Sequence, residues 1–305
     1  MTDERPEPEL PRAIALAWGV AANPQRGPKR EMSIEKIVDA AIEIADAEGL
    51  GAVSMSRVAQ SLGFTTMSLY RYVTSKDDLV ALMQESGTGV PPEPEEDLAG
   101  WRERLDFLFR AQLAVYGRHP WLLDVPIVGS PVTPNSVAWM DAMLEALAEL
   151  PIDEEERIGI VLLFTGQVRW QGIVEKSYDA AAAATGVDPH TIDDTASELY
   201  DALITAEEYP AMRRAVDAGV FRGDADPFAF GLDRLLDGVA AYLDTRVAGA
   251  PSDMRDLPEP EPHEIEADKK VREARKAIRE AEKALRLARK LERQARKEAR
   301  QKLRD

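Results

Sequence analysis

The chain has 305 residues, a formal net charge of −17, 45% hydrophobic residues and no cysteine. This length is typical of about two domains, and the apolar fraction is sufficient for a buried core. Without cysteine there is no disulfide, thiol nucleophile or cysteine zinc site, and the three histidines (His119, His190 and His263) lie far apart in the sequence. We therefore predict neither a metal nor a cofactor.

Composition divides the chain into five segments. We expect an N-terminal arm over residues 1–31, a compact helical unit over 32–86, a larger helical domain over 98–249, a Pro/Glu-rich linker over 250–263 and a basic helical tail over 264–305. The apolar stretch 14–22 follows acidic rather than basic residues, unlike a signal peptide. The longest apolar runs, such as 158–164, fall well short of the ~20 residues that span a membrane. The sequence predicts a cytoplasmic protein without membrane contact.

Apolar residues recur at intervals of three and four, and strand-like alternation is not evident. In the unit 32–86 the expected helix caps are Ser33, Ser54, Thr65 or Thr66, and Ser75. Gly49 is expected to end the first helix, and Gly63 to allow a tight turn between the second and the third. The helices expected in the larger domain cover 98–117, 134–149, 153–184, 189–205, 208–218 and 226–247. The predicted fold class is all-α.

Two short helices joined across a glycine are typical of a helix-turn-helix, whose second helix enters the major groove of DNA. The residues expected to face outward there are Thr65, Thr66, Met67, Ser68, Tyr70, Arg71 and Tyr72. Hydroxyls can bond bases or phosphates, and methyl-bearing side chains suit the thymine methyl group. Tyr70, Tyr72 and Lys76 are expected on phosphates, with Arg57 as a further DNA-binding residue. The alternative is a plain helical bundle with ordinary polar residues on its surface.

The negative charge of the chain does not by itself exclude DNA binding. Basic residues flank the predicted reading helix on both sides, and they include Arg26, Lys29, Arg30, Arg57, Arg71 and Lys76. A Debye length of about 8 Å at physiological salt screens more distant acids. We therefore expect operator binding with strong salt sensitivity and weak non-specific affinity.

A specific motif extends over the same segment. The pattern A-x-x-L-G-[FV]-x-x-x-[ST]-L-Y-x-[HY]-[FV]-x-[ST/N]-K is matched by Ala59, Leu62, Gly63, Phe64, Ser68, Leu69, Tyr70, Tyr72, Val73, Ser75 and Lys76. On this motif, residues 34–83 resemble the N-terminal domain of TetR-family transcriptional repressors. The family more often has His at the position of Tyr72, so the chain departs from the pattern there. The resemblance implies a homodimer in which each subunit contributes one helix-turn-helix to half of a palindromic operator.

Two later segments carry the resemblance further. Residues 118–147 are similar to the ligand-binding domain of repressors related to the tetracycline repressor, and residues 226–243 resemble its last dimerisation helix. The resemblance covers roughly residues 10–247 and implies that a small molecule separates the two reading heads and releases DNA. The expected architecture is an N-terminal three-helix helix-turn-helix DNA-binding domain, a larger helical ligand-binding and dimerisation domain, and an added charged C-terminal helix.

Aromatic residues on the apolar faces of the larger domain are candidates for a ligand pocket. The predicted ligand-binding residues are Phe107, Trp121, Trp139, Met143, Phe164, Gln167 and Trp170. The alternative is that these side chains simply form the hydrophobic core. A polar residue among them, such as Gln167 or Arg169, favours a ligand-binding site in which it anchors the ligand. No complete magnesium–tetracycline site is present, and His119 is more simply a helix-end residue than a metal ligand. The expected effector is small and apolar or amphipathic.

The helices 158–174 and 228–243 are the predicted dimer contacts. Both carry apolar residues at helical spacing and small residues, such as Gly166 and Gly231, that permit close approach. Two helices from each subunit would form a four-helix bundle. The alternative is that they pack only within one chain.

The tail 264–305 has the opposite charge to the rest of the chain. It contains 16 Lys and Arg against 9 Asp and Glu, a net charge of +7, so the remainder carries −17 − 7 = −24. Its apolar stripe of Val271, Ala274, Ile278, Ala281, Leu285 and Ala288 is coiled-coil-like but half alanine. Three interpretations remain open: a solvated single helix, a helix that pairs with itself or a partner, and a helix that touches DNA phosphates.

The residues bear on three classes of function: an enzyme, a transcriptional repressor and an interaction protein. An enzyme is not expected, because the chain has no Gly-rich phosphate loop, no GxSxG elbow and few histidines. The favoured function is a ligand-responsive transcriptional repressor that binds double-stranded operator DNA as a homodimer and is released by a small-molecule effector. The alternative is a DNA-associated interaction protein whose C-terminal helix recruits a partner.

Overall fold

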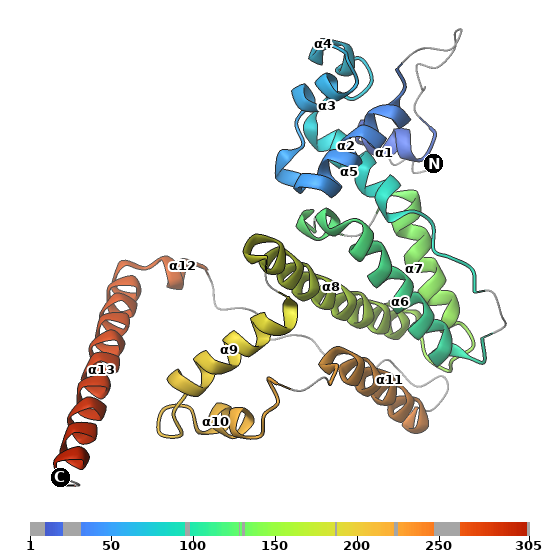
Figure 1. The fold of residues 1–305 in the computed structure, drawn as a ribbon. Coiled ribbons are helices and arrows are strands. Elements are labelled where there is room, and N and C mark those ends of the chain that lie inside the picture. Colours follow the sequence, from blue (N-terminus) through green and yellow to red (C-terminus); the bar gives the residue numbers. More distant parts are fainter. Residues whose placement is uncertain are drawn as a thin grey trace. The chain divides into compact units, whose positions relative to one another are not determined.

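The computed structural model describes residues 10–20, 32–94, 98–127, 129, 132–186, 188–222, 225–246 and 263–303. Every regular element in these ranges is a helix, as the sequence predicts (Figure 1). The chain divides into two compact units, Met1–Asp253 and Met254–Asp305. None of the described helices is both long enough and apolar enough to cross a membrane.

The N-terminal part of the first unit holds the predicted helices. They are α2 (Ile34–Glu48), α3 (Met55–Ser61), α4 (Thr66–Leu69) and α5 (Lys76–Thr88), with a short 3-10 turn η1 (Leu50–Ala52). The side chains of the expected caps, Ser33, Ser54, Thr65 and Ser75, each accept a backbone N–H of the first turn. Gly49 (φ +83°) and Gly63 (φ +73°) occupy the left-handed region that their places in the chain require. The local sequence therefore determines the ends of these helices.

A further helix, α1 (Arg12–Ala17), lies in the segment that was expected to be an arm. It packs against α5, with Ala13 buried, and the indole Nε1 of Trp18 donates to the carbonyl of Val132 at 2.7 Å. Because six residues make a marginal helix in isolation, the packing rather than the local sequence stabilises it. Arg26, Lys29 and Arg30 lie outside the described residues.

Seven elements lie in the described residues of the larger domain. They are α6 (Trp101–Arg118), the 3-10 helix η2 (Pro120–Asp124), α7 (Pro134–Ala146), α8 (Glu154–Thr185), α9 (Pro189–Leu203), α10 (Pro210–Asp217) and α11 (Pro227–Thr245). The six predicted α-helices are all present in the predicted order, with ends shifted by a few residues. Helix α8 contacts α6, α7, α9, α11 and η2, so it is the central element of this domain (Figure 1). The fully buried residues of this domain include Leu105, Phe164 and Val168.

Glu156 fastens α11 to the start of α8. It completes a capping box with Asp153, and it also accepts hydrogen bonds from Tyr242 and from Arg246 (Nε at 3.2 Å). Burial raises the pKa of Glu156, but the hydrogen bonds from Tyr242, the Asp153 amide and Arg246 outweigh burial and lower the pKa to about 2. The ionised carboxylate is therefore the form that holds the two helices together.

We expect Glu156→Gln to lower the free energy of unfolding by about 2 kcal/mol, because hydrogen bonds to a charged group are lost while Arg246 stays buried. Since the folded pKa is depressed, the stabilisation is complete above the unfolded pKa near 4.5 and is lost as pH falls toward about 2. Urea unfolding at pH 7 and at pH 3 measures both effects. The variant should lose less stability between these pH values than the wild type, and equal losses would contradict this role.

In the second unit, the described residues 263–303 form α12 (His263–Ala267) and α13 (Lys269–Lys302). Asp268 begins α13 by accepting the backbone N–H groups of Lys270 and Val271. At 34 residues, α13 is about 51 Å long. It is the charged C-terminal helix that the sequence predicts.

Candidate DNA-binding and effector-binding sites

The helix-turn-helix is formed by α3 and α4, which pack on each other through Val58, Ala59 and Leu69. The turn between them is closed by a bond from the amide of Phe64 to the carbonyl of Ala59 at 2.8 Å. Thr65 opens α4 by accepting the amide of Ser68. A buried inner face and a fixed turn therefore hold the outer face of α4 in a defined orientation.

The outer face carries most of the predicted DNA-binding residues. Thr65, Met67, Tyr70, Arg71 and Lys76 are exposed, and Arg57, Thr66 and Ser68 are partly exposed. Met67 is the most exposed of these apolar side chains, at 74%. Arg57 forms an ion pair with Glu48 of α2, which directs its guanidinium along the surface. Contacts between these residues and DNA remain predictions.

The prediction that Tyr72 faces outward is wrong. Its side chain is only 8% exposed and belongs to the core beside Leu69 and Val73. Helix α4 ends at Leu69, and the amide of Tyr72 bonds to the Leu69 carbonyl at 2.8 Å. Tyr72 follows the buried Leu69 by three residues, a helical spacing that places both side chains on the same face. Tyr70 is therefore the exposed tyrosine of the motif.

A polar joint connects the DNA-binding helices to the larger domain. Asp46 of α2 contacts His119 (Oδ1 to Nδ1, 2.8 Å) and accepts the indole N–H of Trp121 at 2.7 Å. The Trp121 side chain is 1% exposed, and a Cβ added at Gly87 of α5 would lie 3.0 Å from its ring. The segment His119–Trp121 is therefore packed against both α2 and α5.

A second set of bonds joins α5 to α7. The Glu85 carboxylate accepts the amide of Asn135 at 3.0 Å, and the Asn135 side chain donates to the Glu85 carbonyl at 2.8 Å. The indole N–H of Trp139 donates to the carbonyl of Gly89 at 3.0 Å. Movement of α7 or η2 must therefore displace or break contacts with α2 and α5.

The interior of the larger domain contains a polar cluster on α6 and α8. Burial raises the pKa of Tyr116, and the neighbouring Arg169 and Gln112 partly offset this effect. Arg169 also donates to the carbonyls of Leu123 and Val125, both at 2.9 Å. Among the described side chains, the Gln112 Oε1 is a buried acceptor without a hydrogen-bond partner. An unsatisfied acceptor of this kind is costly, and a ligand donor would relieve it.

The predicted ligand-binding residues separate into three groups. Met143 of α7 and Phe164 of α8 are buried, and Phe107 of α6 is partly buried against the same core. Trp121 and Trp139 are buried, but their N–H groups are used at the joint with the DNA-binding helices. Gln167 packs against α11, where its Nε2 lies 3.3 Å from a Cβ built at Gly231.

Trp170 does not lie in the interior as predicted, because its side chain is 57% exposed on α8. Trp170 follows the buried Phe164 by six residues, which turns its side chain about 120° away from Phe164 around the helix. Gln112 and Tyr116 were missed by the sequence analysis. Their spacing of four residues on the buried face of α6 is the signal that points to them.

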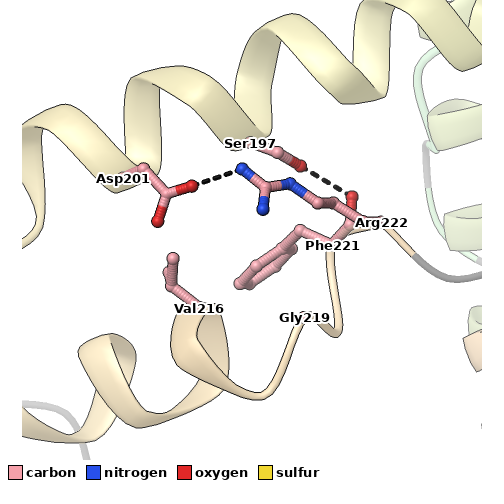
Figure 2. A pocket seen from close by; sticks show the side chains of 6 residues that line it. All are labelled: Ser197, Asp201, Val216, Gly219, Phe221 and Arg222. Atoms are coloured by element: carbon pink, nitrogen blue, oxygen red, sulfur yellow. Dashed lines mark hydrogen bonds and ion pairs between the residues drawn. The ribbon is translucent and has the colours of Figure 1, made fainter.

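A shallow depression between α9 and α10 is not assigned as a ligand site (Figure 2). It has essentially no room for even a water molecule, whereas pockets for drug-sized ligands measure about 300–1,000 Å³. Its polar groups also already have partners: Ser197 donates to the Phe221 carbonyl at 2.7 Å, and Arg222 pairs with Asp201. In the described residues, no group of three or more His, Asp and Glu side chains is arranged to hold a metal ion.

Comparison with known proteins gives two family matches. Residues 37–83 match the family of bacterial regulatory proteins called tetR, and residues 92–243 match the tetracyclin repressor-like C-terminal domain. The chain is 34% identical over 244 residues to the HTH-type transcriptional repressor DrrR1 of Streptomyces coeruleorubidus, covering 78% of this chain and 88% of that protein. It is 22% identical over 220 residues to the tetracycline repressor protein class E of Escherichia coli, covering 70% and 94%.

Solved structures show the same fold. ActR of Streptomyces coelicolor in complex with actinorhodin aligns with a TM-score of 0.59 at 24% identity, over 69% of this chain and 96% of that chain. The family matches extend over both the helix-turn-helix and the larger domain, and the tail lies beyond them. The chain therefore belongs to the TetR family and is a DNA-binding transcriptional regulator with a tetracycline-repressor-like C-terminal domain.

Proposed function

We propose that the protein is a ligand-responsive repressor that binds operator DNA as a homodimer in the cytoplasm and leaves it when a small molecule binds the larger domain. The observation that carries the proposal is the exposed outer face of α4, whose inner face is buried. The helices beside it, α2 and α5, form hydrogen bonds with the larger domain. The relative DrrR1, which is described as a repressor, supports the direction of regulation.

The test is binding to the intergenic DNA upstream of the gene that encodes this chain. Fluorescence anisotropy should show a preference of about 10³-fold or more over a scrambled duplex of the same length. The logarithm of affinity should fall by several units per tenfold rise in salt, since Lys and Arg contacts release counterions from the phosphates. Equal affinity for the two duplexes at every salt concentration would contradict the proposal.

Exposed apolar residues on α8 and α11 support the homodimer. They are Leu162, Leu163, Trp170 and Phe230, and Phe230 is 62% exposed. Large apolar side chains grouped on neighbouring helices favour burial against another surface. We assign Trp170 to this proposed dimer surface. The alternative is that α8 and α11 pack only within one chain. They do contact each other, but that contact leaves these four side chains exposed to solvent.

The proposed effector site lies beside Gln112, Tyr116 and the interior aromatic residues. A phenol, a guanidinium and a carboxamide lie together on α6 and α8, and they suit a small amphipathic molecule with a hydrogen-bond donor. The donor would reach the Gln112 Oε1 acceptor. ActR structures with (S)-DNPA and actinorhodin support a ligand in a domain of this fold.

We expect Gln112→Met to leave the free energy of unfolding within about 0.5 kcal/mol of the wild-type value in the absence of effector, because removal of an unsatisfied buried acceptor offsets loss of the hydrogen bond with Tyr116. It should also raise the effector concentration needed for operator release about tenfold. Gln171→Met is the matched control, since its Nε2 donates to Glu175 at 2.8 Å and its loss should destabilise by about 1 kcal/mol. Urea unfolding distinguishes the two, and a destabilised Gln112→Met chain would contradict this assignment.

A further inference from the structure

Helix α13 carries a charge opposite to that of the rest of the chain. It contains 15 Lys and Arg against 5 Glu, a net charge of 15 − 5 = +10, so the remaining residues carry −17 − 10 = −27. A body of that charge is repelled by DNA phosphates. The Lys and Arg side chains that could offset this repulsion are thus concentrated on α13.

Most acids of α13 have partners within the same helix. Lys269 pairs with Glu273, Lys276 with Glu280, and Arg296 with Glu292, each four residues apart. Glu298 accepts the side-chain amide of Gln294 at 3.2 Å. These contacts stabilise an isolated helix and hold acidic groups against their own neighbours. The interspersed acids therefore do not prevent the helix from presenting a cationic face.

Arg272, Arg279 and Lys283 form the centre of that cationic face. Their spacings of seven and four residues place them on one side of the helix, and all three side chains are exposed. Within the described part of α13 they form no ion pair. Glu273, Glu280 and Glu298 share a different side, at register positions about 100° away. The helix therefore has a cationic side separate from an acidic one.

The apolar side of α13 is less suited to burial. Val271, Ile278 and Leu285 alternate with alanines, and α13 contains no aromatic residue. Alanine buries little area in a coiled-coil seam, and amphipathic membrane helices depend on larger apolar side chains. Charge is therefore the stronger property of this helix, and it favours a polyanion as the partner.

We propose that α13 binds the phosphate backbone of double-stranded DNA beside the operator, as a contact that is independent of base sequence. The proposal extends the operator binding proposed above. Nine of the sixteen bases in the tail 264–305 are arginine, whose planar guanidinium suits phosphate oxygens. The length of about 51 Å matches about 15 base pairs at 3.4 Å each.

Attachment to the same chain makes this contact effectively intramolecular. Once the helix-turn-helix is bound, the local concentration of DNA around α13 is high, so even a weak phosphate contact adds to the total affinity. The contact should also steer the acidic body toward DNA at low salt. Affinity for all DNA should therefore increase, whereas the preference for the operator should not.

The test uses the full chain with Arg272→Gln, Arg279→Gln and Lys283→Gln combined. On a scrambled duplex at ~0.1 M salt, we expect the dissociation constant to rise about 10- to 100-fold and the salt slope to shrink by about 3 per protomer. The ratio of operator to scrambled affinity should stay within about threefold of wild type. The matched control combines Glu273→Gln, Glu280→Gln and Glu298→Gln, and it should instead tighten binding to both duplexes. Glutamine preserves helix propensity, which circular dichroism checks.

Three results would overturn the proposal. The first is an unchanged salt slope on both duplexes. The second is loss of the dimer in sedimentation of the cationic-face variant, which would assign α13 to pairing between copies. The third is an unchanged DNA affinity together with lost binding to vesicles of anionic phospholipid. A chain whose DNA affinity depends on α13 but shows no operator preference would support this contact and contradict the proposed operator function instead.

Discussion

Arg71→Ala is expected to weaken operator binding by about 1–3 kcal/mol, or roughly 5- to 150-fold. Arg71 is exposed directly after α4, next to the exposed Tyr70, in the region where a helix-turn-helix meets DNA. Its guanidinium is available for a base edge or a phosphate, because no ion pair engages it within the described residues. Fluorescence anisotropy with operator and scrambled duplexes measures the loss.

The two duplexes also identify what Arg71 contacts. Loss on the operator alone indicates a base, whereas equal loss on both, with a salt slope smaller by about 1, indicates a phosphate. Arg104→Ala is the matched control, since Arg104 is an exposed arginine on α6 in the larger domain. An Arg71→Ala chain that binds both duplexes like the Arg104→Ala chain would show that α4 does not meet DNA in this orientation.

Asp46→Ala is expected to uncouple effector binding from DNA release. Asp46 bonds both His119 and Trp121, so it connects the first DNA-binding helix to the start of η2. Coupling free energies between two sites are typically 1–3 kcal/mol. With this contact removed, the effector-induced fall in operator affinity should shrink at least about fivefold. Operator titrations with and without saturating effector measure the ratio.

The same substitution should cost about 1–3 kcal/mol of stability, because the buried Trp121 N–H loses its acceptor. Asp39→Ala on the same helix is the control, since Asp39 is exposed and belongs to no described side-chain bond. It should change neither the stability nor the effector ratio by much. If Asp46→Ala lowers stability but leaves the effector ratio at the wild-type value, the contact is purely structural.

The N-terminal helices were predictable because their signals are local. A serine or threonine at the start satisfies backbone groups within a few residues, so α2, α3 and α5 begin where the sequence indicates, and Gly49 ends α2 as predicted. Helix α1 was not predicted, because packing against α5 stabilises it and this packing cannot be recognised from the local sequence. Tyr72 was misplaced although its spacing of three residues from the buried Leu69 indicates that both lie on one face.

The effector region was less predictable because burial and bonding partners depend on residues far apart in the chain. Phe164 and Trp170 are both aromatic residues of α8, but they lie about 120° apart around the helix, and only Phe164 is buried. Trp121 and Asp46 are 75 residues apart, and their bond exists only after α2 and η2 meet. The pairing of Asn135 with Glu85, 50 residues away, is of the same kind.

The sequence by itself determined the all-α class, the order of the helices, the helix-turn-helix motif and the charged tail, because caps, turns and spacing act over a few residues. Only the tertiary structure decided which side chains are buried, which polar groups join the two functional regions, and that Gln112 is left with an unsatisfied acceptor. Those properties depend on the free energy of desolvating and pairing groups from different helices.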